Sequence, residues 1–347
     1  MSLKRAMMLQ EAQEAPEVAA RLLERNVERV LELVGVIKAR DPQLALTIAR
    51  GSSDHAATFA KYAIETQLGL PVASLAPSVT SVYERQMKLG GALVIGISQS
   101  GASPDIVAPL VAARQKGAIT VAIVNEEGSP LAQAAEYVLP LHAGKEQAVA
   151  ATKSYIASLI ALVQLISTIS PDEKLRKALW NLPAVLQETL KMEGAARENA
   201  ERFRFVEHLI VLGRGLHLGI AQELALKLKE TSGILAEAYS SAEFSHGPIR
   251  VVEPGFPVLA LQADDETSAL TMEAYRNLQE KGAALAIVGA DAALEVPVKL
   301  VTPRTGHRIT DPIAVILASY FLAGHLALHR GLNPDAPPSL SKVTLTV

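Results

Sequence analysis

The decisive stretch of this chain is Gly96-Ile97-Ser98-Gln99-Ser100-Gly101-Ala102-Ser103-Pro104-Asp105. Four apolar residues, 92–95, lead into it, and a helix-like apolar segment, 105–115, follows it. This order predicts a strand, a tight turn rich in hydroxyl groups and the first turn of a helix. A strand that feeds a helix through a tight turn is the basic unit of parallel α/β folds.

The same turn offers several hydrogen-bond donors to an anion. It combines backbone N–H groups and the positive end of a helix dipole with the side chains of Ser98, Gln99, Ser100 and Ser103. It lacks the lysine of a P-loop and the three glycines of a dinucleotide-binding turn, so we interpret it as a site for a small phosphorylated metabolite. The alternative is an ordinary helix cap, in which serine and aspartate only satisfy unpaired N–H groups. The clustering of hydroxyls favours the phosphate site.

Composition limits the class of protein. The chain has 347 residues, of which 49% are hydrophobic, and a formal net charge of −3. This is long enough for two domains, and the near-balanced charge gives no sign of nucleic acid or an anionic membrane as partner. The absence of cysteine excludes disulfides, thiolate metal sites and a catalytic cysteine. We also find no metal-ligand spacing, no signal peptide and no long apolar run, since 155–169 is short, so we expect a soluble cytoplasmic protein.

The sequence contains a duplication. An apolar run that ends at glycine and is followed by a helix pattern occurs at 46–65 and again at 208–230, about 165 residues later. Lys116-Gly117-Ala118 and Lys281-Gly282-Ala283 repeat at a similar offset. Strands alternate with helices in each half, which predicts two doubly wound parallel sheets in three-layer αβα domains. The predicted parts are a helical segment 1–34, a first domain 35–170, a helical linker 171–202, a second domain 203–330 and a tail 331–347.

The halves differ at the turn. Ala263-Asp264-Asp265-Glu266 stands where the first half has its serines, and an acidic turn would repel phosphate. We therefore expect the first half to bind the anion and the second half to contribute other chemistry.

The second half contributes titratable groups. Glu223, Lys227 and Glu230 share one face of an otherwise apolar helix pattern, 220–230. Buried charges are costly unless they are paired or line a cleft, although a solvated face with ordinary ion pairs would show the same spacing. The segment 236–248 is rich in small polar residues and is expected to be an irregular loop. It carries His246 before Gly-Pro, a candidate for proton transfer.

These motifs, taken in order, resemble the SIS (sugar isomerase) family. The similarity is greatest to the isomerase half of glucosamine-6-phosphate synthase, and among proteins of this size to SIS-type glucosamine-6-phosphate deaminases. It covers the chain from about residue 46 to the C-terminus. The segments that carry it are Gly51-Ser52-Ser53, Ser98-Gln99-Ser100-Gly101, Val149-Ala150-Ala151-Thr152-Lys153, Ala225-Leu226-Lys227-Leu228-Lys229-Glu230, Ala236-Glu237-Ala238-Tyr239, His246-Gly247-Pro248 and Leu340-Ser341-Lys342.

The resemblance implies roles for individual residues. Phosphate and sugar would be bound by Ser53, Ser98, Gln99, Ser100, Ser103, Val149, Ala151 and Thr152. Glu230 would move a proton between C1 and C2 with support from Lys227 and Glu223. His246 would open the sugar ring and would reach the site from a partner subunit. Lys342 would form a Schiff base with the open-chain ketose. Ala151 departs from the synthase, which has a serine that touches the sugar at this position.

The chain also lacks the glutaminase half of the synthase and the cysteine that this half requires. The resemblance therefore implies a glucosamine-6-phosphate deaminase that needs no cofactor and acts as a homodimer with shared active sites. The alternatives are an aldose–ketose isomerase, a fructosamine-6-phosphate deglycase, and an isomerase half related to glutamine–fructose-6-phosphate transaminase without its glutaminase. A sugar-phosphate sensor without activity is a further alternative, but residues 1–34 are short and not basic enough for a DNA-binding helix-turn-helix.

Overall fold

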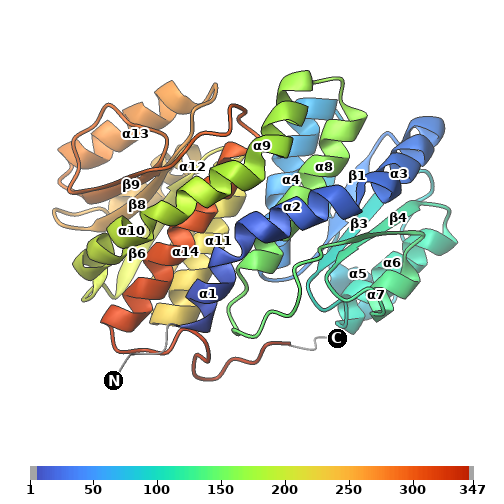
Figure 1. The fold of residues 1–347 in the computed structure, drawn as a ribbon, viewed down its shortest axis with the longest axis horizontal. Coiled ribbons are helices and arrows are strands. Elements are labelled where there is room, and N and C mark those ends of the chain that lie inside the picture. Colours follow the sequence, from blue (N-terminus) through green and yellow to red (C-terminus); the bar gives the residue numbers. More distant parts are fainter. Residues whose placement is uncertain (1–5, 344–347) are drawn as a thin grey trace. The chain divides into compact units, whose positions relative to one another are not determined.

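The computed structural model of the chain describes residues 6–343, and Figure 1 shows the order of its elements. The residues group into two compact units, each built on one sheet. The A unit comprises Glu17–Glu146, Lys153–Trp180 and the tail from Ser341. The B unit comprises the chain up to Pro16, Gln147–Thr152 and Asn181–Leu340. The domain limits expected from the sequence remain a prediction.

The A unit contains a five-stranded parallel sheet. Its strands are β1 (Ala45–Ile48), β2 (Val72–Ser74), β3 (Leu93–Ser98), β4 (Ile119–Val124) and β5 (Tyr137–Pro140). They lie in the order β2-β1-β3-β4-β5, and all pairs are parallel. Every residue of β1, β3 and β4 is buried, as expected for strands covered on both faces.

Helices cover both faces of this sheet. α3 (Val27–Arg40), α4 (Ser52–Leu68) and α8 (Lys153–Ile169) pack together on one face, while α5 (Pro77–Ser81), α6 (Pro104–Gln115) and α7 (Pro130–Ala134) pack on the other. The second face holds a core in which alternate residues of the strands, such as Val94 and Val124, meet Leu110 of α6 and Leu131 of α7. The strand residues that point to this face and the inward-facing residues of α6 and α7 thus form one buried layer.

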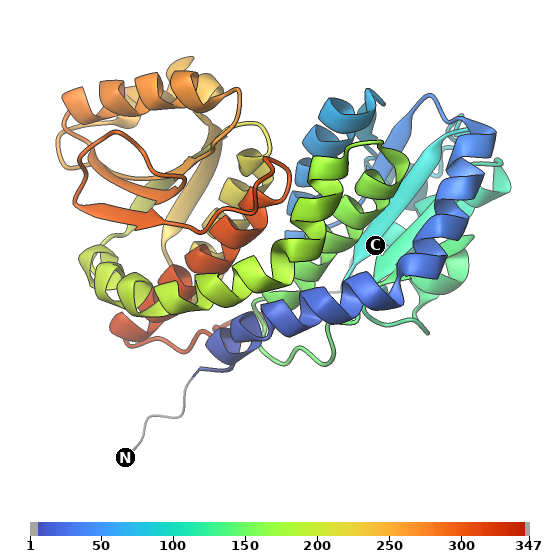
Figure 2. The same cartoon turned by 45° about the horizontal axis from the view of Figure 1, so that its top comes forward.

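The B unit repeats this plan. Its strands are β6 (His208–Gly213), β7 (Leu235–Ser240), β8 (Pro257–Gln262), β9 (Ala284–Gly289) and β10 (Val298–Val301), in the order β10-β9-β8-β6-β7. α11 (His217–Ser232) and α14 (Asp311–His329) cover one face, and α12 (Ser241–Ser245) and α13 (Ser268–Glu280) the other. Figure 2 shows this layering, with α13 in orange and α14 in red on opposite sides of the sheet. α1 (Met7–Gln13) and α10 (Glu193–Ala200) pack against α14.

Further helices connect these layers. α2 (Ala15–Arg25) precedes α3, and α9 (Glu173–Thr189) follows α8 and leads through the short 3₁₀ turn η1 (Leu190–Met192) to α10. Two other 3₁₀ turns are η2 (Glu201–Phe203) and η3 (Pro248–Val251). The helical character predicted for 171–202 is confirmed by α9 and α10.

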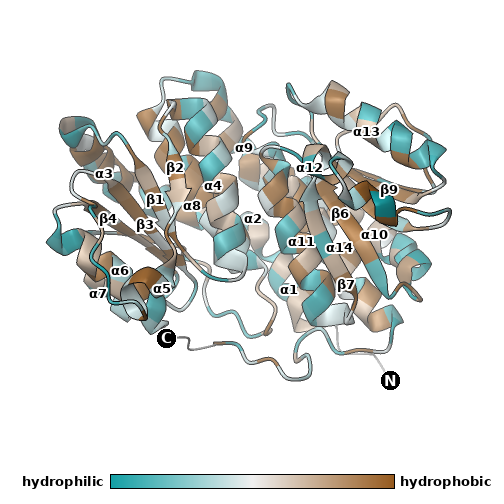
Figure 3. Cartoon of the chain, turned by 180° about the vertical axis from the view of Figure 1, so that it is seen from behind, coloured by the Kyte–Doolittle hydropathy of each residue, from teal (hydrophilic) through white to brown (hydrophobic). Residues whose placement is uncertain are grey.

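Both sheets have the same strand order when their strands are numbered from the first of each half. The predicted duplication and the three-layer α/β fold class are therefore confirmed. Apolar colour follows the strands of both sheets in Figure 3, whereas hydrophilic residues gather on helices such as α13. This is the pattern of parallel sheets covered by amphipathic helices.

One apolar helix, α14, is longer than the apolar run 155–169. Within residues 6–343, α14 alone is long and apolar enough to cross a membrane, with a mean hydropathy of 1.5, but 83% of that window is buried inside the protein. α14 packs against α1, α10 and α11. A helix that is apolar on all sides is buried either in a protein core or in a membrane, and α14 is buried in a core.

The prediction of an irregular loop at 236–248 is wrong. Residues 235–240 form β7, which pairs with β6 along its whole length, and residues 241–245 form α12. β7 is the edge strand of its sheet, so its outward residues are polar and the apolar signal of a strand is weak.

Candidate functional site

The hydroxyl-rich turn lies where the strand order of the A sheet reverses. β1 and β3 are neighbours, and their chains continue in opposite directions along the sheet, β1 to β2 and β3 to β4. α4 begins at Ser52 after β1, and α6 begins at Pro104 after β3, so two helix N-termini meet at the carboxyl edge. Ligands of open α/β sheets bind at such a reversal point, and helix N-termini favour anions there.

The serines of this turn are already hydrogen-bonded to its backbone. The Gly101 N–H donates to Ser98 Oγ at 3.0 Å, and the Ala102 N–H donates to Ser100 Oγ at 3.4 Å. These bonds brace the turn and do not cap α6, since the N-cap residue Ser103 makes no side-chain capping hydrogen bond. They do not compete with anion binding, because a hydroxyl that accepts one hydrogen bond still has its own O–H to donate.

The structure adds a cation that the sequence analysis missed. Arg50, the residue before Gly51, places its Nε 2.9 Å from Asp105 Oδ2, and the Asp105 side chain is fully buried while Arg50 is about half exposed. The pair joins the end of β1 to the first turn of α6. Its only sequence signal is that Arg50 directly precedes Gly51-Ser52-Ser53, and this does not reveal the partner.

Gly101 is required in the turn. Its φ is +60°, and a Cβ there would lie 2.2 Å from Ser129 Oγ. Ser129 is fixed because its Oγ accepts from the Ala132 N–H at the start of α7. We expect Gly101→Ala to lower the free energy of unfolding by about 1–3 kcal/mol and to weaken phosphate binding, because left-handed strain and overpacking add. Urea denaturation and titration with inorganic phosphate measure both effects. Gly128→Ala, where no atom lies within 4 Å, is the control and should change little.

The acidic turn of the second half is neutralised by arginines. Asp264 is paired with Arg304, and Glu266 with Arg308. Asp265 Oδ1 accepts from the Thr267 N–H at 2.8 Å before α13. Arginines more than 35 residues later in the sequence thus supply countercharge to this turn, and the expectation that the first half binds the anion stays a prediction. The acidic side chains of this turn are engaged in ion pairs and in a hydrogen bond with the backbone before α13.

His217, the first residue of α11, is buried and titrates abnormally. Neither ring nitrogen makes a hydrogen bond, and the side chain is 2% exposed. Burial lowers the pKa of His217 to about 4, although the nearby charges of Asp265 and Asp311 act in the opposite direction.

This burial predicts a loss of stability in acid. Between pH 6.5 and pH 4 the unfolded chain binds a proton at His217 that the folded chain does not bind, so stability falls as the pH drops through this window. The full effect is about 3 kcal/mol. Urea denaturation at pH 7 and pH 4.5 should show a smaller loss for His217→Leu than for the wild type. Equal losses in the two proteins would contradict the assignment.

The charged stripe on α11 is buried at one end and open at the other. Lys227 Nζ lies 3.5 Å from Glu223 Oε1 and is also hydrogen-bonded to Glu230 Oε2. Exposure of the side chains is 0% for Glu223, 1% for Lys227 and 22% for Glu230. Tyr320 Oη of α14 donates to Glu223 Oε1 at 3.1 Å. The predicted burial is confirmed, and only Glu230 has a surface that a ligand can reach.

His246 follows α12 and is exposed. The next residue, Gly247, has a φ of +138°, which turns the chain into η3. The ring is thus presented to solvent on a short helix end rather than on a flexible loop.

The segment 147–152 is held from two sides within the B unit. Glu11 of α1 accepts hydrogen bonds from the N–H groups of Gln147 and Ala148. The Val149 N–H donates to the Asp335 carbonyl at 3.0 Å, and the Asp335 carboxylate in turn accepts from the N–H groups that begin α1. Val149, Ala151 and Thr152, which the resemblance assigns to sugar and phosphate, lie on this anchored segment.

Lys342 lies in the A unit and has a specific partner there. Its Nζ donates to Glu146 Oε2 at 2.7 Å, and the Glu146 side chain is fully buried. Glu146 was not singled out in the sequence, because a single glutamate between lysine and glutamine carries no signal. The pairing spans 196 residues of chain and becomes visible only in the fold.

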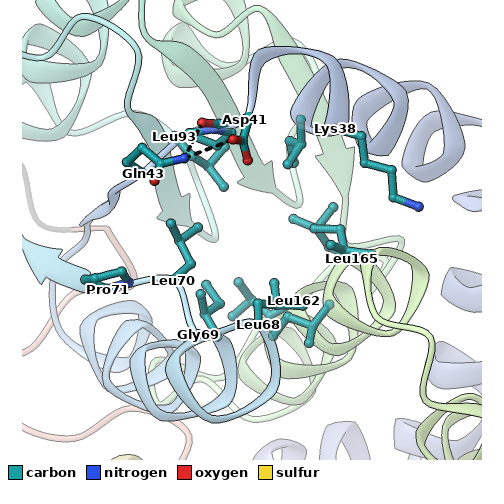
Figure 4. A pocket seen from close by; sticks show the side chains of 15 residues that line it. Lys38, Asp41, Gln43, Leu68, Gly69, Leu70, Pro71, Leu93, Leu162 and Leu165 are labelled. Atoms are coloured by element: carbon teal, nitrogen blue, oxygen red, sulfur yellow. Dashed lines mark hydrogen bonds between the residues drawn. The ribbon is translucent and has the colours of Figure 1, made fainter.

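The A unit also has a cavity at the opposite, amino edge of its sheet. It measures about 310 Å³ and lies between the carboxyl ends of α3, α4 and α8. Figure 4 shows leucine side chains, Leu68, Leu162 and Leu165 among them, turned toward its centre, with Asp41 and Gln43 on one side. Helix carboxyl ends and a carboxylate disfavour phosphate, so this cavity is not the expected sugar-phosphate site.

The predicted site residues thus fall into two groups. Ser53, Ser98, Gln99, Ser100, Ser103 and Lys342 belong to the A unit, and Val149, Ala151, Thr152, Glu223, Lys227, Glu230 and His246 belong to the B unit. A single site that combines both groups remains a proposal.

Comparison with known proteins fits this architecture. The sequence model of the SIS domain matches residues 40–168 and 203–294, one match in each half. Glutamine–fructose-6-phosphate aminotransferase (isomerizing) from Aeropyrum pernix is 34% identical over 98% of this chain, and the same enzyme from Symbiobacterium thermophilum is 32% identical over 96%. The chain spans a little over half the length of these relatives, 57% and 58%.

Solved structures give the same family. A protein from Silicibacter pomeroyi, provisionally called a phosphosugar isomerase, is 40% identical with a TM-score of 0.88, over 95% of this chain and all of that one. The C-terminal domain of glucosamine-fructose-6-phosphate aminotransferase from Francisella tularensis is 28% identical with a TM-score of 0.87, over 96% and 99%. Glucosamine-6-phosphate deaminase from Thermotoga maritima, at 22% identity and a TM-score of 0.78 over 98% and 100%, shares the fold. The chain belongs to the SIS domain family and is an enzyme of the phosphosugar-isomerase type.

Proposed function

We propose that the chain converts an amino-sugar 6-phosphate, most simply glucosamine 6-phosphate, into fructose 6-phosphate and ammonia. The observation that carries this proposal is the reachable carboxylate of Glu230 beside the buried Lys227. A base held next to an ammonium group and open on one side is suited to moving a proton between adjacent carbons. The hydroxyl-rich turn of the A unit supplies the phosphate ligands that such a substrate needs.

The proposed reaction proceeds on the open-chain sugar. His246 opens the ring, and Glu230 takes the proton from C2 and returns it to C1 through an enolamine. The product of this transfer has an alcohol at C1 and an imine at C2. Water then adds to C2 and ammonia leaves, which gives fructose 6-phosphate. Lys342 can form an imine with the same C2 carbon, and no step requires a cofactor.

The test is a panel of sugar phosphates. Purified protein is incubated with glucosamine 6-phosphate and other amino-sugar 6-phosphates, and ammonia and fructose 6-phosphate are measured together. Equal amounts of the two products are expected. Isomer formation without ammonia would replace the deaminase by an isomerase, and no turnover with any phosphosugar would overturn the proposal.

An aldose–ketose isomerase is the second candidate. It is favoured by the relatives at 30% identity or more, whose names include the word isomerizing. The same C1–C2 proton transfer on glucose 6-phosphate or fructose 6-phosphate uses Glu230 in the same way. A fructosamine-6-phosphate deglycase would use the same groups, and the panel includes its substrate for this reason.

We also propose that the active enzyme is a cytoplasmic homodimer in which His246 serves the partner's site. The exposed ring at the end of α12 supports this arrangement. A mixture of inactive His246→Ala and Glu230→Gln proteins should then regain up to about a quarter of wild-type activity, because about half of the dimers are hybrids and each hybrid has one intact site of two. Activity after mixing is the measurement, and a mixture that stays as inactive as its components would contradict shared sites.

A further inference from the structure

The partner of Lys342 has chemistry of its own. Glu146 lies on the connection between β5 and α8, and its side chain is fully buried. Its carboxylate accepts hydrogen bonds from the Ser154 N–H at 3.1 Å, the Ser154 hydroxyl at 2.7 Å and Lys342 Nζ at 2.7 Å. Ser154 is the second residue of α8, so the helix dipole adds to the stabilisation of the anion. The carboxylate is thus held in place by the body of the A unit.

Lys342 is the more exposed member of this pair. It lies in the C-terminal tail, beyond α14, and its side chain is 24% exposed. Further charged groups near Glu146 in the sequence are Lys145 and Lys153, the latter being the buried first residue of α8. A lysine ammonium at 2.7 Å from a carboxylate forms a charge-assisted hydrogen bond and is protonated. A protonated amine has no lone pair and cannot attack a carbonyl.

We propose that Glu146 is the positioning residue of Lys342: it fixes the amine in the A unit and accepts the proton that the ammonium must lose before it attacks a sugar carbonyl. The inference rests on the proposed function, in which Lys342 forms an imine. It assigns a task to a buried carboxylate that the proposed reaction otherwise leaves unused.

The step balances. Lys342 Nζ transfers one proton to Glu146, and its lone pair forms the bond to the carbonyl carbon. The carbonyl oxygen takes one proton directly from the nitrogen and the other back from Glu146, and it leaves as water. The iminium that results keeps one proton on nitrogen and again faces a carboxylate. The negative charge of Glu146 therefore favours both the resting ammonium and the iminium.

Two readouts test this role on the full chain. The first is trace acetylation of Lys342 with acetic anhydride at one fixed pH, followed by mass spectrometry of the tail peptide. Glu146→Gln should increase the labelling of Lys342 several fold, because the amine loses its charge-assisted hydrogen bond to a carboxylate. The second is reduction of the imine with cyanoborohydride in the presence of fructose 6-phosphate. Trapping on Lys342 should slow by about tenfold or more in Glu146→Gln, because the amine is no longer positioned and the amide cannot accept its proton.

Glu127→Gln is the matched control. Glu127 is an exposed glutamate of the same unit, paired with Arg29 at 3.0 Å, and both readouts should stay at wild-type values. If Glu146→Gln fails to fold, Ser154→Ala loosens the carboxylate without removing its charge. Trapping should then slow by a few fold, and unaltered trapping would contradict the proposal.

The outcomes separate this inference from the proposed function. Unchanged labelling and trapping in Glu146→Gln would overturn the role of Glu146, while a trapped adduct on Lys342 would leave the imine standing. A wild-type enzyme that turns over but never traps sugar on Lys342 would overturn the imine, and the role of Glu146 in that step would be overturned with it.

Discussion

Glu230→Gln is expected to reduce turnover of the best phosphosugar substrate by about 10²–10⁴-fold, with sugar-phosphate binding nearly intact. The substitution keeps the size of the side chain and a hydrogen bond to Lys227, but it removes the base. Of Glu223, Lys227 and Glu230, which share one face of α11, Glu230 has the most exposed side chain, 22%, so it can meet a substrate proton. Steady-state kinetics with ammonia or ketose detection separates kcat from KM.

A second readout makes this prediction specific to proton transfer. Solvent deuterium should enter C1 of the product in the wild-type enzyme, because the proton that returns to C1 exchanges while it resides on the carboxylate. Glu243→Gln, on an exposed glutamate of α12, is the control and should retain activity. Turnover of Glu230→Gln at the wild-type rate would mean that another group is the base.

Lys227→Met should lower the free energy of unfolding by about 3–5 kcal/mol, because it leaves the carboxylate of Glu223 buried without its countercharge. Glu223 is fully buried, and Tyr320 Oη also donates a hydrogen bond to it. A neutral hydroxyl does not replace the positive charge that a buried carboxylate needs. Chemical denaturation at pH 7 is the measurement.

Two further variants isolate the cause. Lys191→Met removes an ion pair with Glu188, three residues earlier, but both side chains are mostly exposed, so stability should change by less than about 0.5 kcal/mol. The double variant Lys227→Met/Glu223→Leu removes the orphaned charge and should recover a large part of the loss. Failure of the second substitution to restore stability would show that packing, not charge, is responsible.

Local patterns in the sequence predicted the framework well. The turn 98–103 was recognised as a strand-to-helix turn, and β3 and α6 meet there. The segment 236–248 failed for a physical reason: β7 is an edge strand, so its side chains alternate weakly, and its strand character comes from hydrogen bonds to β6.

Functional residues were predictable where they share one local element. Glu223, Lys227 and Glu230 are spaced by the helix period, so their common face follows from the sequence. Glu146 and Arg50 were missed because each has its meaning only through a partner that lies far away along the chain, Lys342 and Asp105. Neither glutamate nor arginine is unusual at its position.

The sequence by itself determined the alternation of strands and helices, the duplication and the phosphate-type turn, because hydrophobic period and turn chemistry act over a few residues. Only the tertiary structure decided which charges are buried, which carboxylate is reachable and which residues pair. Those properties depend on how far each group is removed from water and on what the fold brings within 3 to 4 Å of it. The acidic turn shows this most clearly: its own residues predict repulsion of anions, but Arg304 and Arg308 neutralise it from a distant part of the chain.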